Sequence, residues 1–300
     1  MTIKTLLFGA GGGVSTYLEN NQNRHYLGLL DNDENKIGTN IAGLEVFPLS
    51  ILKVIEFDEI VLTTQWALDV KRQLIEQLYV PESKIVIPPK NNLKKAEPFF
   101  HQPTRDLALA LIFEINSLAI DLKIPLVIDF GTLLGMVREQ GVIKWDDDVD
   151  FSLPIGFENQ MEQLLNRFVC TTSLCVNWVI EKSVDKQNKT LGFLLRFTSG
   201  NYDFVEFKTS FSFREIQGGN SVHLPSLGMW FAPKIYFNSF ELLEVGRNKL
   251  QVPTAYEEYL SFLYGDWSKP KKDMRLSDYE NINSVSFYDV KNAGLKVERL

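Results

Sequence analysis

Apolar runs separated by glycines and polar turns divide the first ninety residues into short strands and helices. Residues 3–8 (IKTLLF) and 26–30 (YLGLL) have the length of strands, and the first run leads directly into a glycine turn. Residues 59–63 and 84–87 predict two more strands, and the pattern over 67–78 predicts an amphipathic helix between them. Strands that alternate with helices in this way are typical of a parallel sheet of the Rossmann type.

The pattern changes after a stretch rich in proline, amides and charge. Residues 105–122 are apolar on most faces and predict a buried helix, and residues 131–140 predict a second helix that ends at Gly141. A polar turn at 185–189 separates two of the later strands. The strands expected in this part of the chain are 125–130, 178–181, 191–198 and 202–207.

These patterns predict two domains of the α/β class. The first is a Rossmann-like domain with a parallel sheet over residues 1–90. Residues 91–103 form a linker, because prolines and polar residues replace the periodic apolar positions there. The second domain covers residues 104–300.

Four carboxylates fall within five residues behind Trp145. They are Asp146, Asp147, Asp148 and Asp150. In an extended segment Asp146, Asp148 and Asp150 point to one face and Asp147 points to the other. Like charges at this spacing repel one another, and the apolar neighbours of the run argue against the alternative of a solvated acidic turn. The run therefore predicts a site for a hard divalent cation, Mg²⁺ or Mn²⁺.

The residues in front of this run have the features of a phosphate site. Gly131 and Thr132 open the predicted helix directly after a strand, and a helix N-terminus attracts anions. Thr132 either contacts a phosphate or caps the helix, and Arg138 either adds a positive charge or forms a surface ion pair. We assign substrate binding to Gly131, Thr132, Arg138, Lys144 and Asp203.

A further carboxylate is expected from a later strand, since two-metal sites use ligands that are distant in sequence. Asp203 and Glu206 both lie in the apolar run YDFVEF. They sit on opposite faces of a regular strand, so only one of them can face the site. We favour Glu206 over Asp203.

Two blocks of this chain resemble the LicD family of phosphotransferases, which includes the fukutin-like proteins. The first block is GTLLG with Arg138, Gly141 and WDDDVD, and the second has Val252-Pro253, Tyr259-Leu260 and Tyr264-Gly265-Asp266-Trp267. Glu139, Val142, Lys144 and Glu206 depart from the usual residues of the family, which leaves the donor and the acceptor open.

This resemblance implies a nucleotidyltransferase-like α+β domain with a mixed sheet. It also implies a magnesium site made by Asp148, Asp150 and Glu206 with support from Asp146, and a catalytic role for these residues and Arg138. The implied reaction moves phosphocholine or a phospho-alditol from a CDP-linked donor to a hydroxyl of a glycan or glycolipid. Lipopolysaccharide, capsule and teichoic acid are acceptors of this kind.

The first domain carries an incomplete dinucleotide-binding fingerprint. Gly9 and Gly11 match its first two glycines, but Val14 replaces the third. This segment resembles the Rossmann-like N-terminal modules of bacterial polysaccharide-biosynthesis proteins, which implies a nucleotide site at Gly9, Gly11, Gly12 and Asp31. The alternatives are a module of the same shape without a cofactor, and an NAD-dependent oxidoreductase.

The composition of the chain limits the classes of partner that we expect it to bind. A net charge of −7 argues against a nucleic-acid partner, since nucleic-acid binders concentrate positive charge. No apolar run approaches the length of a membrane span and the N-terminus does not resemble a signal peptide, so we expect a cytoplasmic protein. The basic stretch from Lys269 to Arg275 leaves open a peripheral position at the inner face of a membrane. A sugar-nucleotide-binding scaffold without catalytic activity is the alternative to an enzyme, and the sequence does not fix the oligomeric state.

Overall fold

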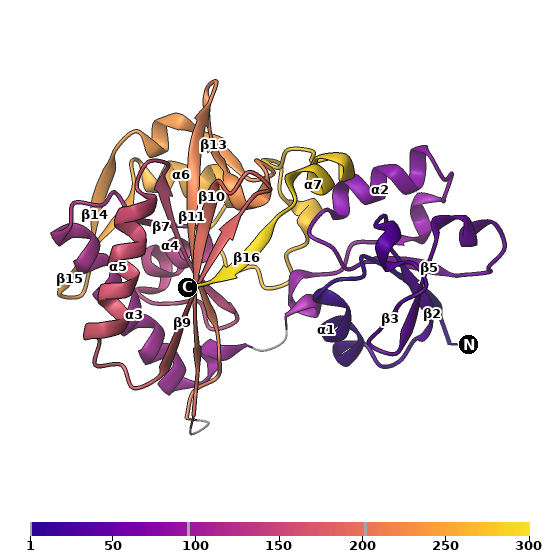
Figure 1. Ribbon diagram of the computed structural model, residues 1–300, viewed down its shortest axis with the longest axis horizontal. Helices are drawn as coiled ribbons and strands as arrows, with labels where there is room; N and C mark the ends of the chain where they lie inside the picture. The colour runs from indigo at the N-terminus through magenta and orange to yellow at the C-terminus, as the bar shows by residue number, and fades with distance from the viewer. Residues whose placement is uncertain (1, 95–96, 201–202) are drawn as a thin grey trace. The chain divides into compact units, whose positions relative to one another are not determined.

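The computed structural model describes residues 2–94, 97–200 and 203–300, and the chain divides into two compact units (Figure 1). The first unit consists of residues 1–95, 271–280 and 284–287. The second unit consists of residues 96–270, 281–283 and 288–300.

The first unit is a six-stranded sheet in the order β3-β4-β2-β1-β5-β6. All neighbouring strands pair in parallel except β3 with β4. Its elements are β1 (Lys4–Phe8), α1 (Gly13–Asn20), β2 (His25–Leu30), β3 (Asn40–Ile41), β4 (Leu44–Phe47), β5 (Glu59–Leu62), α2 (Ala67–Glu76) and β6 (Ile85–Val86). The parallel strands follow the Rossmann order, which confirms the predicted fold of this part of the chain.

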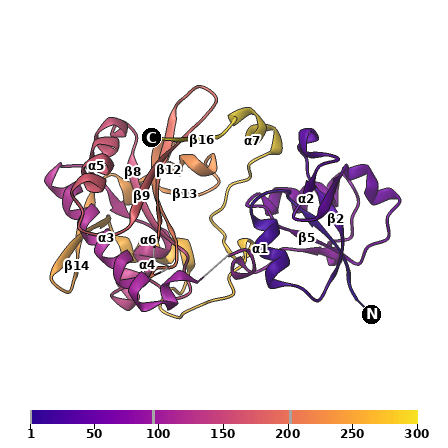
Figure 2. The ribbon, with the colours of Figure 1, turned by 60° about the horizontal axis from the view of Figure 1, so that its bottom comes forward.

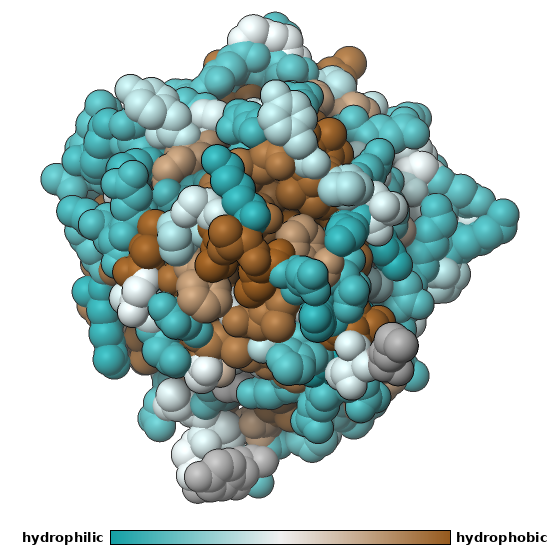
Figure 3. All heavy atoms as spheres, turned by 90° about the vertical axis from the view of Figure 1, so that its right-hand side faces the viewer, coloured by the Kyte–Doolittle hydropathy of each residue, from teal (hydrophilic) through white to brown (hydrophobic). Residues whose placement is uncertain are grey.

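Side chains of β1 alternate between two apolar clusters on opposite faces of this sheet. Leu6 and Phe8 belong to the cluster that α2 covers, and Leu7 belongs to the cluster that α1 covers. On the α2 face a short 3₁₀ turn, η2 (Leu49–Lys53), and Leu276 also pack against the cluster, and several apolar side chains stay partly exposed. Apolar side chains also gather in the middle of the face in Figure 3, with hydrophilic residues around them.

Two late segments of the chain complete the first unit. The backbone N–H of Lys90 donates to the carbonyl of Met274 at 2.9 Å, and Arg275 donates to the carbonyl of Ile87 at 3.0 Å. The N–H of Val285 donates to Asp69 at 3.0 Å. Because these bonds hold residues 271–280 and 284–287 to the Rossmann-like sheet, these two segments do not belong to the second unit, in which the sequence had placed them.

The second unit contains a mixed sheet in the order β13-β12-β11-β10-β9-β16, with β8 paired to β11 and β7 paired to β8. The pairing of β8 with β11 is parallel and the other pairs are antiparallel. The strands are β7 (Val127–Ile128), β8 (Asp148–Pro154), β9 (Asn177–Val184), β10 (Thr190–Thr198), β11 (Lys208–Gln217), β12 (Asn220–His223), β13 (Phe231–Pro233) and β16 (Lys296–Arg299). The mixed sheet confirms the predicted fold class.

Helices and one hairpin pack on this sheet to form a single large core (Figure 2). Helix α5 packs against both α3 and strand β10. The helices are α3 (Gln102–Asp121), α4 (Phe130–Glu139), α5 (Glu158–Thr171) and α6 (Tyr256–Tyr264), and the hairpin is β14 (Phe240–Val245) with β15 (Asn248–Pro253). Helix α7 (Phe287–Ala293) has no buried residue and contributes no side chain to this core. The predicted helices at 105–122 and 131–140 correspond to α3 and α4.

The strand expected over 202–207 is wrong for the described part of that segment. Tyr202 lies outside the described residues, and residues 203–207 are not in a strand. The N–H of Val205 donates to the hydroxyl of Thr104 at 2.8 Å, and Phe207 is buried against Phe99 and Phe197. These contacts fix the segment against helix α3 and the core, and the strand begins only at Lys208.

Candidate active site

Strands β8 and β11 share one polar face and one apolar face. In their parallel register Asp148 lies opposite Lys208, Asp150 opposite Ser210, and Ser152 opposite Ser212. The alternate positions are buried in the core, where the rings of Phe151 and Phe211 stack at 5.2 Å. Because side chains alternate along a strand, every second residue of the pair contributes to one polar ladder.

Three carboxylates converge at the start of this ladder. One oxygen each from Asp146, Asp147 and Asp148 lies within 4.8 Å of the others, and all three residues are half-buried. The prediction that Asp147 points to the opposite face was wrong, because β8 begins only at Asp148 and the alternation does not extend to the two residues before it. Among the described residues, this is the set of acidic side chains placed to share one ion.

Gly131 lies directly against this carboxylate group. A Cβ atom at Gly131 would overlap the Oδ2 atom of Asp146. Gly131 is the second residue of helix α4, so the absence of a side chain lets Asp146 approach the positive end of the helix. The group that lies against Gly131 is therefore a carboxylate of the protein itself, and the substrate-binding role of Gly131 stays a prediction.

Thr132 holds β8 against helix α4. Its side chain is 2% exposed, and its hydroxyl accepts the backbone N–H of Asp150 at 2.8 Å. The helix cap is Asp129, whose Oδ1 accepts the N–H of Phe130 at 2.7 Å. The alternative of Thr132 as the cap was wrong, and its burial leaves it little surface for a phosphate.

Asp150 sits one step further along the ladder and is outside the group of three. The hydroxyl of Ser210 donates to its Oδ1 at 2.6 Å. Burial raises the pKa of Asp150 well above its ordinary value, and the neighbouring charge of Asp148 raises it further. Asp150 is therefore coupled to Asp148 through charge, although it does not share the same point of convergence.

Lys208 is the cation of the ladder. Its Nζ lies 3.4 Å from Oδ2 of Asp148. The charge of Asp148 raises the pKa of Lys208, with smaller contributions from Asp150 and Asp147, and this outweighs the opposing effect of burial. Lys208 was not among the predicted site residues, although the alternation of Lys208, Ser210 and Ser212 with buried positions is the signal for a strand with one polar face.

The two candidates for a later carboxylate are not part of the convergent group. Asp203 and Glu206 are both exposed, and neither belongs to the set of described side chains placed to share one ion. On β11 the positions that face Asp148 and Asp150 are held by Lys208 and Ser210 instead. A metal-binding role for Glu206 stays a prediction.

Neither Arg138 nor Lys144 is among the described contacts of Asp146, Asp147 and Asp148. Arg138 is in the last turn of α4, about 12 Å along the helix axis from its start at 1.5 Å per residue. Its guanidinium donates to the carbonyl of Trp267 at 3.2 Å and to Glu139 at 2.7 Å. Lys144 is exposed. Arg138 thus ties α4 to the segment that follows α6.

The residues of the first unit that were predicted to bind a nucleotide differ in their exposure and their contacts. Gly11 and Gly12 are exposed, with open space where a Cβ would be. Gly9 has a φ of 108°, and a Cβ there would meet Thr64 at 2.8 Å, so this position requires glycine. Asp31 accepts the N–H of Ala10 at 2.8 Å and pairs with Lys36 at 3.0 Å, so its carboxylate serves the glycine turn itself.

A family model described as "LicD/FKTN/FKRP, nucleotidyltransferase domain" matches residues 123–255. We call residues 123–255 the LicD domain after this match. The match covers the carboxylates, helix α4 and strand β11, and it supports a transferase role in glycan biosynthesis. A second model, "C2185-like, N-terminal", matches residues 1–86. No curated protein matches the chain.

Solved structures share only low similarity with the chain. The antibiotic-resistance factor ANT(2'')-Ia is 14% identical over 59% of this chain and 81% of its own, with a TM-score of 0.33. UDP-D-quinovosamine 4-dehydrogenase from Vibrio fischeri is 20% identical over 28% of this chain and 75% of its own, with a TM-score of 0.23. A myo-inositol dehydrogenase from Corynebacterium glutamicum is 12% identical over 84% of this chain and 81% of its own, with a TM-score of 0.23.

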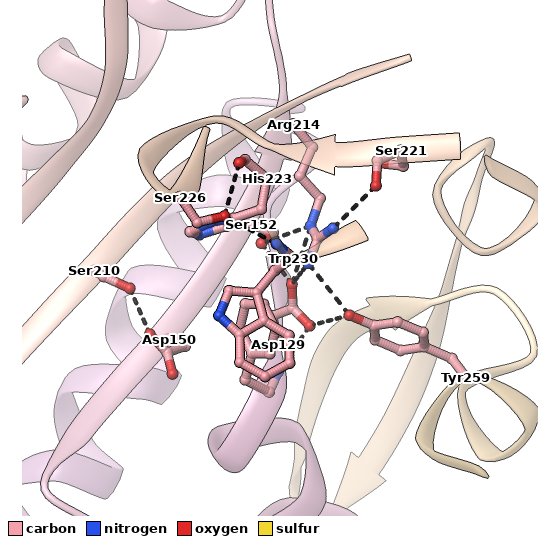
Figure 4. Close-up of polar contacts among 11 residues, drawn as sticks. Asp129, Asp150, Ser152, Ser210, Arg214, Ser221, His223, Ser226, Trp230 and Tyr259 are labelled. Atoms are coloured by element: carbon pink, nitrogen blue, oxygen red, sulfur yellow. Dashed lines mark hydrogen bonds and ion pairs between the residues drawn. The ribbon is translucent and has the colours of Figure 1, made fainter. Parts of the chain in front are cut away.

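A buried ion pair supports the site from within the second unit (Figure 4). Arg214 on β11 donates to Oδ2 of Asp129 at 2.8 Å, and both side chains are almost fully buried. Ser152 and Tyr259 also donate to Asp129, each at 2.6 Å. Burial alone would raise the pKa of Asp129, but Arg214 and these hydrogen bonds hold it below its ordinary value. None of the predicted site residues belongs to this network, which joins α4, β8, β11 and α6 of the second unit.

Aromatic side chains of the LicD domain pack around Phe130. Its ring meets His223 edge-on at 5.6 Å and Trp230 at 5.8 Å, and the Arg214 guanidinium lies 5.3 Å from its centre. Burial lowers the pKa of His223 to about 3, and the charge of Arg214 lowers it as well. His223 is therefore a neutral ring at physiological pH, with Nδ1 hydrogen-bonded to Ser226 at 2.9 Å.

None of the helices in the described ranges combines the length and the apolar character needed to span a bilayer.

Proposed function

We propose that the LicD domain catalyses metal-dependent transfer of a phospho-group from a nucleotide-diphosphate-linked donor to a hydroxyl of a cell-surface glycan or its precursor. The observation that carries this proposal is the convergence of Asp146, Asp147 and Asp148 beside Gly131 at the start of α4. It combines a set of hard oxygen ligands with the positive end of a helix, which suits a divalent ion and a phosphate.

The donor set fits Mg²⁺ or Mn²⁺. Carboxylate oxygens are the ligands that these ions prefer, and Mg²⁺ is commonly held by one or two carboxylates together with substrate phosphates. Asp146, Asp147 and Asp148 would hold the ion, and Asp150 and Glu206 are further candidates. Such an ion neutralises charge on the phosphates and polarises the reacting phosphorus centre.

The residues around the carboxylates keep their geometry fixed. Thr132 accepts the backbone N–H of Asp150. The Asp129 carboxylate accepts the N–H of Phe130 in the first turn of α4 and pairs with Arg214. Phosphoryl transfer depends chiefly on positioning and on electrostatic stabilisation, with little covalent chemistry by the protein. A rigid frame of this kind supports that reaction.

We further propose a CDP-linked donor that carries choline or an alditol, with a glycan or glycolipid hydroxyl as acceptor. This part of the proposal rests on the LicD match and on the WDDDVD and YGDW blocks. The donor group and the acceptor sugar are to be identified by experiment, because Glu139, Val142 and Lys144 depart from the residues that are usual in the family.

The proposal is tested by release of CMP from CDP-choline, CDP-glycerol and CDP-ribitol with the full-length chain, Mg²⁺ and added sugars whose hydroxyls accept the phospho-group. We expect turnover of one of these donors, loss of turnover with excess chelator, and a fall of more than about 100-fold for Asp148→Asn, since metal-ion stabilisation contributes several kcal/mol. Asp106→Asn is the matched control, because Asp106 is an exposed acid on α3. Full activity of folded Asp148→Asn would contradict the proposal.

The alternative of a scaffold that binds a sugar nucleotide without turnover gives a different result in the same assay. It predicts thermal stabilisation by a CDP-linked compound with no release of CMP from any donor. Glu206→Gln is included, since a fall comparable to that of Asp148→Asn would establish Glu206 as a ligand.

A further inference from the structure

Strand β11 presents a lysine and a serine, and no carboxylate, to the two carboxylates of β8. Lys208 and Ser210 are the residues of β11 that lie opposite Asp148 and Asp150 in the parallel register. Lys208 Nζ lies 3.4 Å from Asp148 Oδ2, and the Ser210 hydroxyl donates to Asp150 Oδ1 at 2.6 Å. Both carboxylates on the strand therefore already have a partner from the neighbouring strand.

The position of Lys208 is fixed by the fold. The residues before and after Lys208 in the sequence are both buried. Thr209 lies on the core face, and Phe207 packs against Phe99 and Phe197. Alternation then requires the Lys208 side chain to leave the sheet on the same face as Asp148. The Lys208 side chain is 46% exposed and that of Asp148 is 23% exposed, so the ammonium borders the carboxylates while it stays accessible to a ligand.

The charges explain what this ammonium does. Asp146, Asp147 and Asp148 converge within 4.8 Å, and a single divalent ion leaves part of their negative charge uncompensated. A lysine ammonium is a compact point charge that binds phosphate well. Because it is part of the chain, this positive charge does not have to be supplied by an ion from solution. A cation at this place both offsets the carboxylates and attracts an anionic ligand.

We propose that Lys208 takes the place of a second metal ion, so that the site binds one divalent ion at Asp146, Asp147 and Asp148 and uses the Lys208 ammonium to contact a phosphate of the donor. This inference rests on the proposed function. It assigns a substrate-binding role to a residue of β11 and sets the metal stoichiometry of the site at one.

The test is calorimetric titration of the full-length chain with Mn²⁺. We expect one ion per wild-type chain. Lys208→Met removes the charge with little change in length, so we expect it to bind Mn²⁺ at least about fivefold more tightly or to take up a second ion, because a unit charge at 4 Å is worth about 1 kcal/mol even in water. Lys208→Arg keeps the charge and is expected to bind one ion like the wild type.

Lys189→Met is the matched control. Lys189 is 41% exposed and pairs with Glu215 at 3.2 Å, so it resembles Lys208 in exposure and pairing, but it lies directly before β10 and pairs outside the carboxylate group. Its Mn²⁺ binding is expected to equal that of the wild type. The thermal unfolding of each variant shows whether it is folded.

A second titration uses inorganic diphosphate at saturating Mn²⁺. Lys208→Met is expected to bind diphosphate about tenfold more weakly, as for the loss of a hydrogen bond between charged groups. Two ions per wild-type chain, or equal binding of Mn²⁺ and of diphosphate by wild type and Lys208→Met, would overturn this inference alone. Failure of the wild type to bind any Mn²⁺ would overturn the proposed function together with it.

Discussion

The carboxylate of Asp146 occupies the space that a side chain at residue 131 would need. A Cβ atom on Gly131 would overlap Oδ2 of Asp146, and Gly131 lies in the first turn of helix α4. The glycine therefore serves the approach of a carboxylate to a helix end, and its φ angle is not among the positive values that favour glycine.

Gly131→Ala is expected to weaken Mn²⁺ binding at least about tenfold with little loss of stability. The methyl group must displace Asp146, whereas alanine within a helix gains about 0.5–1 kcal/mol over glycine. Calorimetry with Mn²⁺ and urea denaturation measure the two effects separately. Gly219→Ala is the control, because nothing lies within 4 Å of a Cβ at Gly219. Unchanged Mn²⁺ affinity in Gly131→Ala would show that Asp146 is not a ligand.

Asp129→Asn is expected to lower the free energy of unfolding by about 3–5 kcal/mol. The substitution leaves the buried guanidinium of Arg214 without its anion, and an unpaired buried charge is costly. Urea denaturation at pH 7 measures the loss. Tyr259→Phe removes one hydrogen bond to the same carboxylate and is expected to cost about 1–3 kcal/mol. If the two variants lose the same amount, the ion pair is not the main contribution of Asp129.

The free energy of unfolding is expected to fall as the pH is lowered from 7 to 5, in part because of His223. Its pKa is about 3 in the folded chain and about 6.5 when unfolded, so below pH 6.5 only the unfolded chain takes up this proton. The contribution of His223 to the free energy of unfolding is fully present above pH 6.5. Below pH 6.5 this contribution falls by up to about 1.4 kcal/mol for each pH unit.

Urea denaturation at several pH values checks this dependence. His223→Asn is expected to be less stable at pH 7 but to show a flatter slope between pH 7 and 5. His25→Gln serves as the control, because His25 is exposed. A slope in His223→Asn as steep as that of the wild type would mean that another group causes the pH dependence.

Thr132→Val is expected to lower the free energy of unfolding by about 1–3 kcal/mol. Valine keeps the shape of threonine but leaves the backbone N–H of Asp150 without its acceptor. Thr132→Ser keeps the hydroxyl and should lose only the packing of one methyl group. Urea denaturation of both variants separates the hydrogen bond from the packing, and equal losses would argue against a role for the hydroxyl.

Sequence patterns were sufficient for elements whose local signals agree with their packing. The apolar run before the glycine turn became β1, and the GTLLG helix became α4 with an end close to the predicted one. The alternation of Asp148, Val149 and Asp150 also fixed which face of β8 is polar. In each case the same residues determine both the backbone conformation and the buried face.

Other parts of the site depend on contacts between distant segments, which a local pattern does not contain. YDFVEF alternates in the manner of a strand, yet the bond of Val205 to Thr104 on α3 keeps it out of the sheet. Arg214 and Asp129 are far apart in sequence, and they meet because β8 pairs with β7 on one side and with β11 on the other. Lys208 was missed for the same reason, since its role follows from the register.

The return of residues 271–280 and 284–287 to the Rossmann-like sheet limits how this protein can be divided or recombined. A fragment that ends before residue 271 would lose the bonds that Met274, Arg275 and Val285 make with the first unit. A gene fusion that exchanged residues 1–90 alone would separate that sheet from the segments that complete it. The first unit is therefore expected to reach its full stability only when the chain also carries residues 271–280 and 284–287.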